Sequence, residues 1–435
     1  MRMKRHITKQ LENWKNSENK KPLIIKGARQ VGKTYAIREF AKQNYDHLVE
    51  INFERDYEFV NLFNQTRKPS EILNYLRLTY MGIPFNARTL LFLDEIQACS
   101  QALTSLKFLS EEFPCDIICS GSMLGVAIAS TSSFPVGYVE TWDMYPMTFT
   151  EFIEALGVPS DTIEMIDLHI KNRMPLPEVI HQKMNEIFLS YVIVGGMPEV
   201  VSKYVQTKSY ADSLLIQRRI VSDYLNDIAK YALGADRIKA RECFESIPLQ
   251  LAKDNKKFQY KLIKNGGSAR HYEGSLKWLE DSGLIIPVYR LKNIDLPLEV
   301  YRELSVFKVY FCDTGMLVSQ LNDGAIKALS LGDLGVYKGA IYENIAAQIL
   351  REANKKAYYF EPNTTSEIDF IIYYEGTMAP LEIKAGTNTK STSFNHFVEK
   401  YQPKYAYRLS QKNISEKSMP LYALEFLLNH EQNLF

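Results

Sequence analysis

The sequence predicts a multidomain α/β protein whose first part is built on a parallel sheet. The chain has 435 residues, which is more than one ordinary hydrophobic core can serve. Two short apolar runs near the N-terminus have the continuous hydrophobicity of buried parallel strands. The first run leads into a glycine loop and a helical pattern, and the second ends in two acidic residues. Toward the C-terminus, a charged β-hairpin follows a helical segment and indicates a further α/β domain.

Composition limits the classes of function. The net charge is +1, so a nucleic-acid-binding surface would have to be a local patch. The five cysteines form no CxxC pair, and we expect reduced thiols in a cytoplasmic protein. The basic N-terminus is followed by no apolar stretch, so we expect no signal peptide. No run of about 18 apolar residues occurs, and we expect no contact with a membrane.

The glycine loop has the GxxxxGK[ST] spacing of a phosphate-binding loop. It lies between the predicted strand 22–25 and a predicted helix, the context in which backbone N–H groups face an anion. Lys33 would reach the β- and γ-phosphates of ATP and assist catalysis, and Thr34 would bind Mg²⁺. The alternative is a plain surface turn. The predicted nucleotide contacts are Gly27, Ala28, Arg29, Gln30, Val31, Gly32, Lys33, Thr34, Tyr35 and Ser122.

The second apolar run, Leu90 to Leu93, is followed by Asp94 and Glu95. Ligands bind at the carboxyl ends of parallel strands, so this position suits a nucleotide site. We expect Asp94 to hold Mg²⁺ and Glu95 to polarise the attacking water. A solvated acidic turn is the alternative.

Two further strands are expected in this part of the chain, at residues 48–54 and 115–122, with a helix at 100–113 between the acidic pair and the second of these strands. Ser120 or Ser122, after the strand at 115, could contact the γ-phosphate. A plain turn explains these hydroxyls equally well.

The segments "PLIIKGARQVGKT", "TLLFLDEIQ" and "CSGSMLG" resemble the AAA-type ATPases of prokaryotes that carry a C-terminal domain of unknown function. The resemblance continues through "YPMTFTEFIEALG", "YVIVGGMPEVV", "DYLNDIAKY" and "FKVYFCDTGML", and so covers nearly the whole chain. It implies an AAA-type core with ATP and Mg²⁺ as ligands. The family pattern calls for a basic residue after Gly137, where this chain has Tyr138, so no arginine finger is identified.

The middle of the chain is predicted to be helical and then to form a winged helix. Thr148 and Glu151 have capping-box spacing, and we expect a helical lid at residues 146–235. Residues 257–291 have the order helix, turn, helix, strand of a winged helix. Residues 253–292 include nine Lys and Arg but only four Asp and Glu, so this stretch has a local excess of positive charge. Double-stranded DNA is therefore a candidate partner, and packing against protein is the alternative. The candidate DNA contacts are Arg270, His271 and Lys277.

The C-terminal hairpin carries Asp369 on its first strand and Glu382 and Lys384 on its second, with Glu343 on an upstream helix. This arrangement resembles the restriction-endonuclease-like superfamily. The resemblance implies Mg²⁺ held by Asp369 and Glu382, Lys384 orienting or deprotonating water, and Glu343 as a further ligand. A charged hairpin with an ordinary salt bridge is the alternative.

Four domains follow from these patterns. They are a P-loop ATPase core at 1–145, a helical lid at 146–235, a winged-helix region at 236–325 and a restriction-endonuclease-like domain at 326–435. Two functions stay open. The first is an Mg²⁺-dependent ATPase coupled to a DNA-directed module that could be a nuclease. The second is a nucleotide-gated switch with slow turnover and a catalytically degenerate C-terminal domain. The sequence leaves the oligomeric state open.

Overall fold

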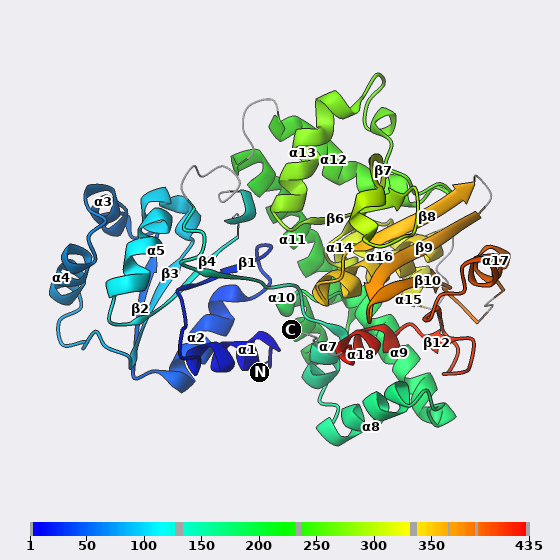
Figure 1. Ribbon diagram of the computed structural model, residues 1–435, viewed down its shortest axis with the longest axis horizontal. Coiled ribbons are helices and arrows are strands. Elements are labelled where there is room, and N and C mark those ends of the chain that lie inside the picture. Colours follow the sequence, from blue (N-terminus) through cyan, green and yellow to red (C-terminus); the bar gives the residue numbers. More distant parts are fainter. Residues whose placement is uncertain are drawn as a thin grey trace. The chain divides into compact units, whose positions relative to one another are not determined.

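The computed structural model describes residues 3–122, 124–126, 134–231, 236–330, 337–363, 366–387 and 390–431. The chain divides into two compact units, each of which is considered by itself (Figure 1). The first, the nucleotide unit, contains residues 4–145 and 281–283. The second, the C-terminal unit, contains residues 1–3, 146–280 and 284–435.

The nucleotide unit is a parallel α/β sheet, as the sequence predicts. Its strands are β1 (Leu23–Lys26), β2 (His47–Asn52), β3 (Thr89–Asp94), β4 (Asp116–Gly121) and β5 (Glu140–Asp143), in the order β2-β3-β4-β1-β5. All four pairings are parallel. Its helices are α1 (Ile7–Lys15), α2 (Lys33–Asn44), α3 (Tyr57–Gln65), α4 (Pro69–Thr79), the short η1 (Ile96–Ala98) and α5 (Ser100–Glu112). Every residue of β3 and β4 is buried, which explains their continuous apolar sequence.

The C-terminal unit begins with a run of helices, namely α7 (Phe149–Ala155), α8 (Ser160–Lys171), α9 (Glu178–Val194), α10 (Pro198–Thr207), α11 (Tyr210–Tyr231), α12 (Asp236–Leu251), η2 (Tyr260–Leu262) and α13 (Ala269–Asp281). The capping box predicted from Thr148 and Glu151 is confirmed. Glu151 N donates to Thr148 Oγ1, and Thr148 N donates to Glu151 Oε2 at 3.1 Å.

A separate mixed sheet occupies the rest of this unit (Figure 1). Its strands are β6 (Ile285–Leu291), β7 (Arg302–Phe311), β8 (Ala357–Asn363), β9 (Ser366–Tyr374), β10 (Thr377–Ile383), β11 (Tyr407–Ser410) and β12 (Met419–Pro420), in the order β12-β11-β10-β9-β8-β6-β7. The accompanying helices are η3 (Leu298–Tyr301), α14 (Thr314–Ser319), α15 (Asp323–Ser330), α16 (Lys338–Glu352), α17 (Thr392–Tyr401) and α18 (Ala423–Asn429). The predicted hairpin is β9–β10, with Leu381 opposite Phe370.

Within the winged helix predicted at residues 257–291, the second helix is present as α13 and the strand as β6, which pairs with β7, whereas the first helix, expected before Gly266, is only the short η2. Its strands, however, belong to the C-terminal sheet, because β6 pairs in parallel with β8 from Tyr289 to Leu291. The sheet therefore crosses the boundary predicted at residue 325, which itself falls inside α15. The winged-helix assignment stays a prediction.

Candidate functional site

The glycine loop joins β1 to α2 in a conformation that requires glycine. Gly27 has a φ of 151° and Gly32 a φ of 95°. A Cβ atom at Gly27 would lie 2.1 Å from the carbonyl oxygen of Met144, just after β5. The backbone of the loop is thus pressed against the segment that follows the edge strand, and α2 begins at Lys33 with its N-terminus at the loop.

The side chain of Lys33 lies inside this loop and hydrogen-bonds to the loop's backbone. Its side chain is 7% exposed, and its ammonium donates to the carbonyl oxygens of Gly27 and Ala28, both at 2.9 Å. Burial lowers the pKa of Lys33 to about 8, although Glu95 and Asp94 act in the opposite direction. An anionic phosphate in the loop would stabilise the charged form of Lys33 and exchange the contacts to neutral carbonyl oxygens for ion pairs.

Asp94 lies at the carboxyl end of β3, beside Thr34. The Thr34 hydroxyl lies 3.4 and 3.3 Å from the two carboxylate oxygens of Asp94. Ser120 donates to one oxygen, and Asn52 Nδ2 donates to the other at 3.2 Å. Burial raises the pKa of Asp94, with a further rise from Glu95 that the Ser120 hydrogen bond opposes. A hydroxyl and a carboxylate side by side form an oxygen donor set that suits Mg²⁺.

Glu95 is held by neighbours on two sides. Gln97 Nε2 donates to Glu95 Oε2 at 2.6 Å, and the backbone N–H and hydroxyl of Ser122 lie 3.4 Å from the same oxygen. Two serines are candidates for contact with the γ-phosphate. Ser120 is fully buried and donates its hydroxyl to Asp94, whereas the Ser122 hydroxyl lies near Glu95. Sequence reasoning missed Gln97 and Asn52. The only signal for Gln97 is its place two residues after Glu95.

The remaining loop residues differ in exposure. Ala28 and Val31 are buried, Arg29 and Gln30 are half-buried, and Tyr35 is 45% exposed, so Tyr35 borders the site from solvent. Tyr138 follows the tight turn at Gly137, and the Lys107 ammonium lies 5.0 Å from the centre of its ring. A cation from α5 therefore lies beside the position where the family pattern has a basic residue.

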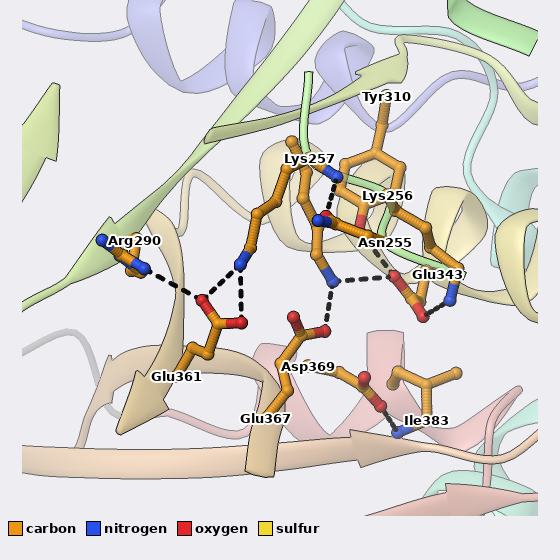
Figure 2. Close-up of polar contacts among 11 residues, drawn as sticks. Asn255, Lys256, Lys257, Arg290, Tyr310, Glu343, Glu361, Glu367, Asp369 and Ile383 are labelled. Carbon is orange, nitrogen blue, oxygen red and sulfur yellow. Dashed lines mark hydrogen bonds and ion pairs between the residues drawn. The ribbon is translucent and has the colours of Figure 1, made fainter. Parts of the chain in front are cut away.

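The structure brings Asp369, Glu382 and Lys384 together at the end of the β9–β10 hairpin. Asp369 Oδ2 accepts a hydrogen bond from Ile383 N at 2.7 Å (Figure 2). Lys384 Nζ and the Ser391 hydroxyl each lie 2.7 Å from Glu382 Oε1. Glu382 is 3% exposed, and its Oε2 atom has no hydrogen-bond partner within the described part of the chain. Burial raises the pKa of Asp369 well above its usual range, and the neighbouring Glu382 and Glu343 raise it further.

Glu343 lies close by but is engaged by three donors of its own (Figure 2). Lys256 donates to Oε1, while Tyr310 OH at 2.7 Å and Lys308 Nζ at 3.3 Å contact Oε2. Burial alone would raise the pKa of Glu343, but Lys308 and Lys256 outweigh it and hold the pKa well below its usual range. Glu343 thus anchors an ion-pair cluster. Among the described residues, no group of three or more His, Cys, Asp or Glu side chains is placed to hold a metal ion.

The same cluster fastens residues 255–257 to the sheet. Lys257 Nζ lies 2.6 and 2.5 Å from the carboxylate oxygens of Glu361 on β8, and Arg290 on β6 contacts Glu361 at 3.0 Å (Figure 2). Lys308 also pairs with Glu367 on β9 at 2.6 Å. These alternating charges join the segment after α12 to four strands, β6 to β9, and to α16.

Replacing Lys308 with Met should destabilise the protein by about 3 kcal/mol, because the change leaves the buried Glu343 and the nearby Glu367 without their shared cation. Lys308 is only 1% exposed, so water cannot take the place of its ammonium. Urea unfolding measures the loss. The matched control is Lys183→Met, at an exposed lysine on α9, which should change stability by less than about 0.5 kcal/mol. Equal stability of the two variants would contradict the prediction.

Arg270, His271 and Lys277 are exposed on α13, as their predicted role requires. Arg270 and Lys277 line a groove of about 650 Å³ between α13 and the β6–β7 pair. Tyr260, Tyr289 and Phe307 line it as well. Glu273 and Glu280 also border the groove, and Lys277 pairs with Glu280 at 3.1 Å, so the groove carries both signs of charge.

The parallel sheet, the glycine loop on Lys33 and the Asp–Glu pair at the end of β3 define a P-loop nucleotide-binding fold. Residues 19–153 match the family model described as AAA domain, so this part of the chain is an AAA-type P-loop ATPase domain. Residues 185–326 and 338–426 match two domains of unknown function, DUF8612 and DUF4143. No curated protein matches the chain. No helix among the described residues is long and apolar enough to cross a membrane.

Several solved structures are similar at low identity. The Walker-type ATPase PABY2304 of Pyrococcus abyssi is 14% identical over 73% of this chain and 96% of its own, with a TM-score of 0.46. The ORC1 protein of Aeropyrum pernix in complex with DNA is 10% identical over 75% and 90%, with a TM-score of 0.31. AMPPCP-bound DnaA from Aquifex aeolicus is 15% identical over 63% of this chain and 86% of its own, with a TM-score of 0.28.

Proposed function

We propose that the protein is an Mg²⁺-dependent ATPase whose nucleotide state controls a DNA-directed C-terminal unit. The observation that carries the proposal is the convergence of Lys33, Thr34, Asp94 and Glu95 at the carboxyl ends of β1 and β3. Thr34 and Asp94 would hold Mg²⁺, which offsets the charge of the phosphates. Lys33 would bind the β- and γ-phosphates, and Glu95 would accept a proton from the attacking water.

The hydrogen bonds on Glu95 fix its orientation in the resting state. Its Oε2 atom accepts from Gln97 and lies near Ser122, so a change of these partners on nucleotide binding would turn the carboxylate toward or away from the attacking water. This observation supports the second function, a nucleotide-gated switch. Release of phosphate from ATP, measured with and without Mg²⁺ and duplex DNA, tests both. Release that needs Mg²⁺ supports the ATPase, and binding of ATP without release supports the switch.

We further propose that duplex DNA binds along α13, and we expect charge reversal there to weaken it. Arg270→Glu with Lys277→Glu should lower affinity and reduce the slope of log K against log salt by about two, since each lost phosphate contact removes about one. Fluorescence anisotropy of a labelled duplex measures both quantities. The matched control reverses two exposed lysines elsewhere, Lys42 and Lys183, and gives the same net charge. Equal affinity of the two double variants would place the DNA elsewhere.

A second candidate activity is metal-dependent cleavage of DNA at Asp369 and Glu382. The buried Glu382 Oε2, which has no hydrogen-bond partner among the described residues and lies near Asp369, favours it, because two such carboxylates suit a cation. Burial would lower the pKa of Lys384, but Glu382 outweighs this and raises it. Lys384 would therefore stay charged and orient water, without taking its proton. The opposing observation is its 2.7 Å ion pair with Glu382, which is also what an ordinary salt bridge provides.

We expect nicking of supercoiled plasmid with Mg²⁺ or Mn²⁺ to be lost in Asp369→Ala and in Glu382→Ala, because each change removes one of the two oxygen ligands. Gel electrophoresis measures the nicked fraction, and thermal unfolding of each variant controls for its fold. Equal nicking by all three proteins would reveal a contaminant. Absence of nicking in the wild type would leave the C-terminal unit as a binding platform.

A further inference from the structure

A buried arginine outside the matched AAA domain supports the phosphate loop. Arg5 precedes α1 and is 9% exposed. One of its terminal nitrogens donates to the carbonyl oxygen of Val31 at 2.6 Å, and the other donates to that of Tyr145 at 2.7 Å. A single planar guanidinium thus joins the glycine loop to the segment after β5, while the AAA match begins only at residue 19.

The helix that follows Arg5, α1, is packed on α2 and so holds Arg5 in place. Helix α1 packs on α2 and buries Ile7, Leu11 and Trp14. Trp14 Nε1 donates to the carbonyl oxygen of Lys21 at 3.0 Å, and the Lys15 ammonium donates to that of Asn44, the last residue of α2. The N-terminal segment is therefore fastened at both ends of α2, with Arg5 at the end that bears the loop.

The contact with Val31 constrains a peptide group that a phosphate would use. In a trans peptide the C=O and the following N–H point in opposite directions. With its carbonyl held by Arg5, the peptide between Val31 and Gly32 must turn the Gly32 N–H away from the guanidinium. The loop around it carries backbone strain at Gln30, which has a φ of 65° without being glycine, whereas Gly32 adopts its φ of 95° at no steric cost.

We propose that Arg5 is a positioning residue of the nucleotide site. It aims the Gly32 N–H at the bound polyphosphate and places a permanent positive charge behind the loop. This proposal rests on the proposed binding of ATP. It assigns to Arg5 an effect on the phosphates, not on the adenine base.

Calorimetric titration of the full chain with MgATP and with magnesium pyrophosphate tests the proposal, since pyrophosphate has no base. Arg5→Met should weaken the binding of both ligands by the same factor, about tenfold or more. The substitution removes the buried charge-assisted hydrogen bond to the Val31 carbonyl, which orients the Gly32 N–H toward the phosphates. Arg5→Lys, which keeps the charge but not the fork, should recover part of the affinity. The matched control is Arg38→Met, at an arginine on α2 that pairs with Glu50 at the surface.

The results of these titrations distinguish a failure of the proposed role of Arg5 from a failure of the proposed ATP site. A wild type that binds neither ligand refutes the proposed ATP site itself. If the wild type binds both ligands and Arg5→Met binds them with the same affinity, the proposed role of Arg5 is overturned. If Arg5→Met binds MgATP more weakly but binds magnesium pyrophosphate as the wild type does, the proposed role of Arg5 is also overturned, because Arg5 would then act on the adenine base. If Arg5→Met does not fold, Arg5→Gln takes its place under the same criteria.

Discussion

Replacing Lys33 with Ala should weaken MgATP binding more than a hundredfold. The ammonium lies inside the loop, where it donates to two of the loop's carbonyl oxygens, and its charge-assisted bonds to two phosphates would contribute about 3 kcal/mol. Isothermal titration of MgATP measures the change. The matched control is Lys42→Ala, at an exposed lysine in the last turn of the same helix, which should bind as the wild type does.

The pH dependence gives this prediction a second readout. The pKa of Lys33 is about 8 in the free protein, so Lys33 is charged below that value and increasingly neutral above it. Because the phosphates favour the charged form, affinity should fall as pH rises through 8, by up to tenfold per unit. This decline should vanish in Lys33→Ala. Near-wild-type affinity in that variant would remove the P-loop assignment.

Replacing Glu95 with Gln should leave MgATP binding intact and slow hydrolysis about a hundredfold or more, as loss of a general base does. The amide keeps the shape of the side chain and an oxygen that can accept from Gln97, so the site should stay assembled. It cannot take a proton from water. The measurements are steady-state phosphate release and MgATP affinity, with Glu58→Gln, at an exposed carboxylate on α3, as the matched control.

Unchanged turnover in Glu95→Gln would mean that another group accepts the proton or that a step other than chemistry limits the rate. A pre-steady-state measurement of the first turnover distinguishes these outcomes. A slower first turnover in the variant supports Glu95 as the base, and an equal one assigns the base elsewhere.

Local patterns in the sequence determined much of the nucleotide unit and some elements of the C-terminal unit. The apolar runs predicted β1 and β3, the glycine spacing predicted the loop before α2, and the capping box at Thr148 predicted the start of α7. The β9–β10 hairpin was predicted from the alternation of its residues. Each of these features depends on residues close together in the chain, whose periodicity and backbone preferences the sequence displays directly.

Tertiary structure alone decided the contacts between distant segments. Arg5 reaches Tyr145 across 140 residues, and Lys256 reaches Glu343 across 87. No local pattern distinguishes either cation from a solvated one. The same holds for β6, which pairs with β8 and so joins the C-terminal sheet. The physical reason is that burial gives these charges and strand edges their partners, and burial depends on how the whole chain folds, so their roles emerge only once the fold has removed water from them.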